Sequence, residues 1–303
     1  MGMTTHVPPK QAPLRAIGLM LTAMAILPII DVIAKILGQG GMPVLEIVWS
    51  RMVFGAALAL PFAVGAEGRQ ALIPDRPLFH LFRSALLICA TFLFFLSLTY
   101  LPIADALAIF FVQPLVVTAL SPFVLGERVG PRRWAAVFVG FIGMLVIIRP
   151  GFGTLNAGSL FALGAGASLA LYMLATRRIA GRAPAMVTTF HTNLMGAGLT
   201  SIGALFVWQT PTPQEWLLFM ALGMIASVGH YLIVRAYDLG EASLLAPLAY
   251  TEMVMATLLG WWYFGDLPDR WTVAGVCILI GCALYIGWRE RAVGKTPVLP
   301  EQI

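Results

Sequence analysis

Long apolar runs separated by short polar segments make up nearly all of this 303-residue chain. A helix needs about 20 consecutive apolar residues to cross the hydrocarbon core of a bilayer, and each run is of that order. The runs are continuous and do not alternate, so they predict helices and not barrel strands, the two folds that satisfy the backbone in lipid. We place ten spans at residues 15–38, 43–65, 79–99, 102–125, 131–149, 158–178, 184–208, 215–237, 241–264 and 270–288. The predicted fold class is an all-α integral membrane protein with ten transmembrane helices.

The composition excludes a soluble fold and gives no sign of an enzyme. Hydrophobic residues make up 59% of the chain and charged residues only 11%, whereas soluble domains carry about 25% charged residues. Cys89, Cys277 and Cys282 lie in apolar runs without the spacing of a metal or redox site. There is no phosphate-binding loop, nucleophile elbow or metal-ligand motif in the sequence. We therefore expect no catalytic residue, cofactor or metal, and keep an intramembrane enzyme as a distant alternative.

The basic residues predict the orientation. Of the 19 Lys and Arg residues, fifteen fall near loops on one side of the ten spans and two (Arg149 and Arg270) on the other. The positive-inside rule then places both termini in the cytoplasm, and we expect a multi-pass protein of the cell inner membrane. The net charge of +5 is explained by these loops, so we expect no nucleic-acid partner.

The two halves of the chain resemble each other at a separation of about 139 residues. Gly126-Glu127 matches Gly265-Asp266, and Gln113 matches Glu252. Each half holds five spans, an odd number, so the second half crosses the membrane inverted relative to the first; this 5+5 inverted repeat is typical of secondary transporters. We predict a disordered cytoplasmic N-terminus, two repeats and a cytoplasmic tail, at residues 1–13, 14–150, 158–289 and 290–303.

Four charged residues lie inside the first two spans, where each is costly without a partner or water. At a rise of 1.5 Å per residue, Lys35 and Glu46 lie about 5 Å from the outer end, and Asp31 and Arg51 about 10 Å. The depths match in opposite-sign pairs, which fits either salt bridges that pin the helices or a site whose pairs open for a substrate. Their counterparts in the second half carry no charge: Tyr172, Thr176, Val187 and Thr192. We therefore predict an outer gate of Lys35 and Glu46, and Asp31 and Arg51 as substrate-binding residues.

Polar residues in later spans extend this site. Glu252, near the middle of span 9, is a candidate for substrate binding and for proton coupling, since a carboxyl at midplane must be paired, wet or protonated. Tyr250 beside it and Gln113 in span 4 are further substrate-binding candidates, as are His191 and Asn193 in span 7. For His191, a satisfied core histidine is the alternative.

Two other polar positions have a simpler interpretation. We expect His230 in span 8 to be a satisfied core residue, with a ligand role as the alternative. Arg83 and His80, at the cytoplasmic start of span 3, are expected to reach lipid headgroups.

Several motifs together resemble the drug/metabolite transporter superfamily, in its ten-span members with two EamA-type repeats. They are Asp31-(x)3-Lys35, Pro43-(x)2-Glu46-(x)4-Arg51, Gln113-Pro114 and the segment LGERVGPRRWAAVFVGFIGMLVIIRPG. The resemblance covers residues 14–290 and implies a central cavity between the halves, built mainly from spans 1–4 and 6–9. The segments DVIAK, LEIVWSR, HLFR and APLAYTE are similar to a bacterial subgroup that includes S-adenosylmethionine and riboflavin uptake carriers.

The expected function is that of a secondary transporter, moving a small organic metabolite across the bacterial inner membrane by alternating access. Uptake of a vitamin or cofactor such as riboflavin is the first hypothesis, on family analogy. An exporter of amino-acid-like metabolites, metallophores or drugs is the alternative. The expected partners are the small-molecule substrate and the lipid bilayer, and the sequence leaves a homodimer open.

Overall fold

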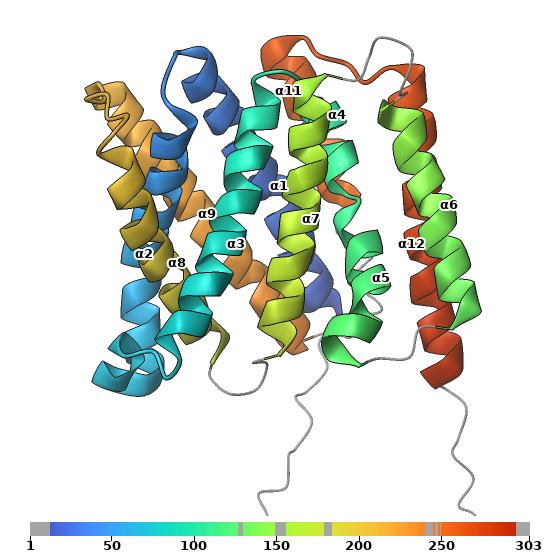
Figure 1. The fold of residues 1–303 in the computed structure, drawn as a ribbon, viewed down its shortest axis with the longest axis horizontal. Helices are drawn as coiled ribbons and strands as arrows, with labels where there is room; N and C mark the ends of the chain where they lie inside the picture. The colour runs from blue at the N-terminus through green and yellow to red at the C-terminus, as the bar shows by residue number, and fades with distance from the viewer. Residues whose placement is uncertain are drawn as a thin grey trace, which may run out of the picture.

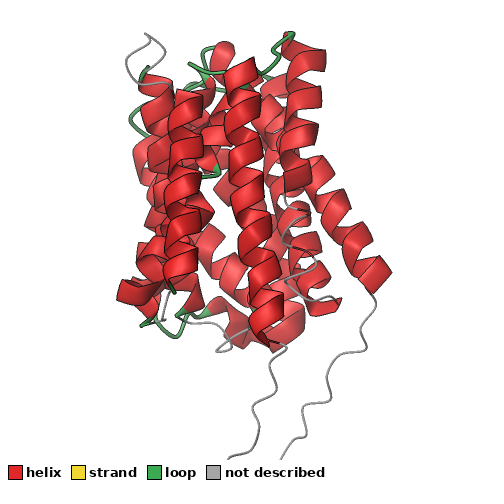
Figure 2. Cartoon of the chain, turned by 90° about the vertical axis from the view of Figure 1, so that its right-hand side faces the viewer, coloured by secondary structure: helices red, strands yellow, loops and turns green. Residues whose placement is uncertain are grey.

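The computed structural model describes residues 13–126, 130–148, 156–178, 184–239, 245, 248 and 250–294, and these contain helices and no strand (Figure 2). In chain order the helices are α1 Pro13–Gln39, α2 Val44–Glu67, the short 3-10 helix η1 Gly68–Leu72, α3 Pro77–Leu98, α4 Ile103–Phe110, α5 Gln113–Leu125, α6 Pro131–Ile148, α7 Ala157–Arg177, α8 Ala185–Ala204, α9 Pro213–Leu239, α11 Thr251–Phe264 and α12 Arg270–Gly294. We call the end of the bundle at which α2 ends and α3 begins the inner end, at the bottom of Figure 1, and the opposite end the outer end.

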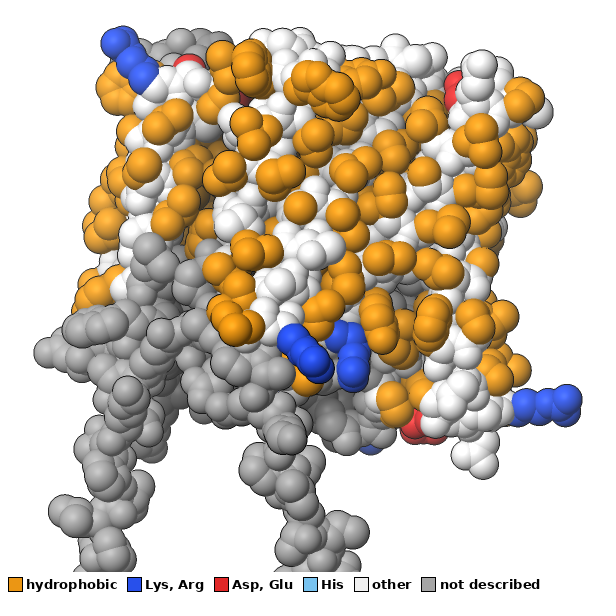
Figure 3. Space-filling view, turned by 180° about the vertical axis from the view of Figure 1, so that it is seen from behind, with side chains coloured by type: hydrophobic (Ala, Val, Ile, Leu, Met, Phe, Trp, Pro, Cys, Tyr) orange, Lys and Arg blue, Asp and Glu red, His pale blue; other side chains and the backbone are white. Residues whose placement is uncertain are grey.

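The helices form a bundle of membrane-crossing length. Six helical stretches are long and apolar enough to span a membrane: Leu14–Gln39, Val44–Leu72, Pro77–Leu98, Ile103–Leu125, Ala157–Thr176 and Pro213–Ile233. Trp134–Ile148 and Arg270–Cys282 are shorter apolar helices. Apolar side chains cover the face seen in Figure 3, and the Lys and Arg side chains on it lie toward its two ends. The chain is an all-helical, multi-pass membrane protein, while the exact count of ten spans remains a prediction.

The predicted span 102–125 is broken into α4 and α5, which follow one another down the bundle (Figure 1). Pro114 lies in the first turn of α5 and has no N–H, so the carbonyl of Phe110 loses its usual helical donor. Helix α7 comes close to this carbonyl at Gly166, where a Cβ atom would lie 2.7 Å from the Phe110 oxygen. The break therefore sits against a helix of the second half.

The ends of α5 and α11 repeat one local geometry at the 139-residue separation. Gly126 caps α5 with φ 71° and Gly265 caps α11 with φ 72°, both in the left-handed region that favours glycine. Their N–H groups donate to the carbonyls of Pro122 at 3.2 Å and Trp261 at 3.0 Å, four residues back in each case. The sequence repeat thus has a structural counterpart at these two turns.

Helices of the first half pack mainly against helices of the second half. The principal pairs are α1 with α9, α3 with α7, α2 with α8, and α6 with α12. If each helix is exchanged for its counterpart in the other half, the α1–α9 pair becomes the α7–α3 pair. The α2–α8 and α6–α12 pairs stay the same, because each of them joins a helix to its own counterpart. In Figure 1 the α2–α8 and α6–α12 pairs form opposite edges of the bundle.

Candidate functional site

Three charged side chains from different helices interact in the interior of the bundle. Asp31 of α1 is 8% exposed, and its carboxylate interacts electrostatically with Glu252 of α11 and Arg51 of α2. The guanidinium of Arg51 donates a hydrogen bond to Thr91 Oγ1 of α3. Asp31 and Arg51 are thus brought together as the sequence suggested, but through space and without a direct ion pair. Two carboxyl groups and one guanidinium are chemically suited to a ligand that carries charges of both signs.

Two aromatic rings meet beside the helix break. Phe111 lies between α4 and α5, and Tyr250 immediately precedes α11. Their rings stack with centroids 5.4 Å apart and an interplanar angle of 26°. The stack joins the two halves of the chain and offers a flat apolar surface next to Glu252.

Gln113, the first residue of α5, lies two residues after Phe111 in the chain. Its Oε1 atom is buried and has no hydrogen-bond partner among the described residues. A buried polar atom without a partner is rare in folded proteins. Gln113 Oε1 is therefore available to accept a hydrogen bond, and the role of Gln113 in substrate binding stays a prediction.

At the outer end, Lys35 of α1 has a different partner from the one that depth counting predicted. Its Nζ lies 2.8 Å from Asp266 Oδ2, in the connection between α11 and α12, and donates to the carbonyl of Leu101 at 3.2 Å. The same Nζ lies 4.7 Å from the ring centroid of Phe264. Lys35 thus ties α1 to two connections at the outer end.

The predicted pairing of Lys35 with Glu46 is wrong. Glu46 is fully buried and its Oε1 accepts a hydrogen bond of 2.6 Å from the backbone N–H of Gln209, between α8 and α9. The two residues have similar depth but point to different neighbours. The sequence did contain a signal for the true partner. Similar segments, LGE and FGD, lie where α5 and α11 end, and the second of them contains Asp266.

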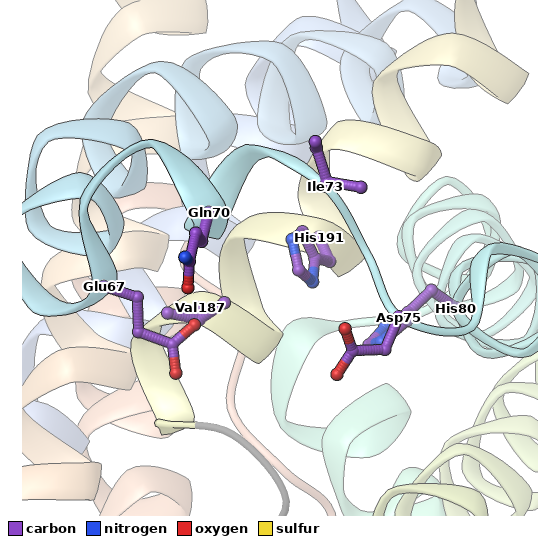
Figure 4. A pocket seen from close by; sticks show the side chains of 7 residues that line it. All are labelled: Glu67, Gln70, Ile73, Asp75, His80, Val187 and His191. Atoms are coloured by element: carbon purple, nitrogen blue, oxygen red, sulfur yellow. The ribbon is translucent and has the colours of Figure 1, made fainter.

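His191 lies in a separate pocket at the inner end, between the α2–α3 connection and α8 (Figure 4). The pocket encloses about 340 Å³ and is lined by Glu67, Gln70, Ile73, Asp75, His80, Val187 and His191. His191 Nε2 donates to the carbonyl of Ala71 at 2.7 Å, and its ring packs edge-to-face on His80 at 5.0 Å. Asn193, two residues along, instead lies against Gly55 of α2. The polar patch of span 7 is therefore divided between two places.

Arg83 is buried and does not reach the surface, contrary to the expectation from its place near the start of α3. It is 1% exposed and donates to Thr176 Oγ1 at 3.1 Å, to His80 Nδ1 at 3.3 Å and to Tyr172 OH at 3.4 Å. Both Thr176 and Tyr172 belong to α7. Arg83 thus joins α3 to α7, because the N–H groups of its guanidinium donate hydrogen bonds to neutral oxygen atoms on α7.

Within the part of the chain that the structure describes, no group of three or more His, Cys, Asp or Glu side chains is arranged to hold a metal ion. The central residues offer charge, a hydrogen-bond acceptor and stacked rings for the recognition of a ligand.

Comparisons with known proteins indicate a family of transporters. The model of the EamA-like transporter family matches residues 14–149 and again residues 156–288. The chain is 29% identical over 261 residues to the S-adenosylmethionine uptake transporter of Rickettsia prowazekii (strain Madrid E), covering 86% of this chain and 88% of that protein. It is 28% identical over 286 residues to the riboflavin transporter of Vibrio cholerae serotype O1, covering 93% and 96% of the two chains.

A more distant relative acts in the opposite direction. The pseudopaline exporter of Pseudomonas aeruginosa is 24% identical over 249 residues, covering 80% of this chain and 85% of that protein. One solved crystal structure matches with a TM-score of 0.64 at 21% identity, over 93% of this chain and 99% of the other. That last likeness concerns the fold alone.

Proposed function

Because this chain belongs to the EamA-like transporter family, we propose that it is a secondary transporter that takes up a charged, cofactor-like metabolite across the bacterial inner membrane. The observation that carries this proposal is the interior group of Asp31, Glu252 and Arg51. Charged residues at membrane depth are costly and mark the paths of substrates or ions. A zwitterionic substrate would meet an opposite charge at each end.

S-adenosylmethionine is the first candidate substrate. Its ammonium and sulfonium groups are complementary to the carboxylates of Asp31 and Glu252, and its carboxylate to the guanidinium of Arg51. One relative is named as an uptake transporter of S-adenosylmethionine, and another as a transporter of riboflavin. Riboflavin, the first hypothesis from sequence, has no charge for this group to bind.

Riboflavin remains the second candidate because of one specific observation. The stacked rings of Phe111 and Tyr250 offer the kind of surface on which a flat aromatic ring system packs. Gln113, with its free Oε1, would accept a hydrogen bond from the polar edge of such a ring.

The transport cycle that we propose is alternating access between two inverted halves, with ten spans and both termini in the cytoplasm. The exchange symmetry of the helix pairs and the duplicated glycine caps support the inverted repeat. Lys35 and Asp266 would form the outer gate, while a gating role of Glu46 stays a prediction. Glu252 would carry the coupling proton.

Uptake by purified protein in liposomes tests the function. We expect saturable accumulation of radiolabelled S-adenosylmethionine, which Asp31→Asn and Arg51→Gln abolish while the variants still reconstitute. Accumulation of labelled riboflavin alone would favour the second candidate. Export from loaded right-side-out vesicles without any uptake would favour the exporter, and no movement of either solute in either direction would refute the proposal.

A further inference from the structure

His230 of α9 occupies an unusual position for a residue that the sequence assigned to the core. At about 100° of rotation per residue, its Cα lies on the arc of α9 between Gly229 and Ser227. Gly229 packs against Leu27 of α1, and Ser227 donates to the carbonyl of Gly55 of α2 at 3.3 Å. His230 therefore points between α1 and α2, toward the middle of the bundle.

Two other residues on this side of α9, Ala226 and Phe219, are buried, but His230 is not. Ala226, one turn before it, is 5% exposed, and Phe219 is fully buried. The His230 side chain is exposed and interacts electrostatically with Arg51 on α2. An exposed side chain on the inward face of a packed helix requires open space inside the bundle.

The ring of His230 is held in one orientation. Its Nδ1 lies 2.7 Å from the carbonyl oxygen of Ala226, and a carbonyl can only accept, so Nδ1 carries the hydrogen. In the neutral ring the lone pair is then on Nε2, which this hydrogen bond leaves free. His230 thus presents Nε2 as a hydrogen-bond acceptor in a fixed orientation, close enough to Arg51 for the two side chains to interact electrostatically.

We propose that His230 faces a water-accessible cavity shared with Arg51, and that its Nε2 accepts a hydrogen bond from an N–H group of the transported metabolite. The second half of this statement rests on the proposed function. In the cavity, Arg51 would bind the anionic end of the substrate and His230 a neighbouring amino or amide N–H. His230 is then a specificity-determining residue, because a substrate without a donor at that point would leave Nε2 unpaired.

Thiol accessibility tests the cavity without depending on transport. In a background in which Cys89, Cys277 and Cys282 are replaced by Ala, His230→Cys is compared with Tyr231→Cys. Tyr231 is the matched control because it lies on the same helix and stacks on the exposed Phe62 at 6.0 Å. With a cationic, membrane-impermeant methanethiosulfonate reagent in permeabilised liposomes, we expect fast reaction at position 230 and slow reaction at position 231. Equal rates, or no reaction at position 230, would overturn the cavity.

Two substitutions of different length test the hydrogen bond. His230→Gln keeps a polar atom near the place of Nε2, whereas His230→Asn keeps one only near Nδ1. For labelled S-adenosylmethionine we expect His230→Asn to raise KM about fivefold, as for one lost hydrogen bond, and His230→Gln to raise it less than about twofold. Tyr231→Phe should leave KM unchanged.

The outcomes separate this inference from the function on which it rests. Equal KM values for the Gln and Asn variants would overturn the role of Nε2, even with transport intact. Protection of the His230→Cys thiol by S-adenosylmethionine or riboflavin supports the substrate contact, and reaction that neither solute slows overturns it. Wild-type liposomes that accumulate neither solute would refute the proposed function, while the thiol reaction would still report on the cavity.

Discussion

The ring of Phe111 stacks on the ring of Tyr250 with centroids 5.4 Å apart, although the two residues belong to opposite halves of the chain. They are also equivalent positions of the repeat, because they differ by the same 139 residues as Gln113 and Glu252. The stack therefore lies where the two halves meet, directly before α5 and α11. Any movement of one half against the other must slide or separate these rings.

The Phe111–Tyr250 contact should contribute stability beyond the burial of each ring. We expect a double-mutant cycle with Phe111→Leu and Tyr250→Leu to give a coupling energy of about 1 kcal/mol, the value for stacked aromatic pairs. Thermal unfolding in detergent measures it. Tyr250→Phe keeps the ring and is the control; a coupling energy near zero would show that the rings are merely adjacent.

Substitution of Gly166 should disturb the break between α4 and α5. Gly166→Ala would place a methyl group 2.7 Å from the Phe110 carbonyl, so we expect a loss of about 1–3 kcal/mol from overpacking. Gly198→Ala is the matched control, because nothing lies within 4 Å of its added methyl group.

The control should itself become more stable, by about 0.5–1 kcal/mol, since alanine is the better helix former. Melting temperatures of the two purified variants in one detergent make the comparison. Equal shifts in the same direction would mean that the close approach at Gly166 does not matter for the fold.

The Lys35–Asp266 pair is expected to hold the outer end closed. Asp266→Asn removes one partner of a pair whose side chains are 7% and 31% exposed. We expect a loss of about 2 kcal/mol, between the values for exposed and buried pairs, and a lower transport rate. Thermal unfolding and liposome uptake measure the two effects.

Charge exchange provides the control for this pair. The double variant Lys35→Asp with Asp266→Lys should recover part of the transport that each single variant loses. If the double variant is no better than the worse single variant, the pair does not act as a gate.

Substitution of Glu252 should separate proton coupling from substrate exchange. Glu252 and Asp31 interact electrostatically in the interior of the bundle, and a carboxyl group at membrane depth marks a path for substrate or protons. We expect Glu252→Gln, which cannot change its charge, to lose accumulation driven by a pH gradient but to keep exchange of labelled for unlabelled substrate.

The half-buried Glu215, which caps the start of α9 by accepting a hydrogen bond of 2.7 Å from the N–H of Thr212, provides the control. Glu215→Gln should respond to the pH gradient as the wild type does. A Glu252→Gln variant that accumulates substrate normally under the gradient would refute coupling through this residue.

Part of this protein follows from sequence alone. The length of the apolar runs gives helices that cross a membrane, because lipid offers the backbone no other partner. Pro114 marks the break in its span, since it removes a helical donor, and the 139-residue repeat indicates that Gly126 and Gly265 end equivalent helices. Each of these features depends on local chemistry or on spacing along the chain.

Tertiary structure alone decided which polar groups meet. Counting along a helix gives the depth of Lys35 but not the direction in which it points, so it suggested Glu46 where the structure has Asp266. For the same reason, counting along the helices did not predict that Arg83 is buried against α7 or that His230 points inward and is exposed. Partners depend on how each helix is rotated about its axis, and that rotation is set by packing between the two halves, which no single span encodes.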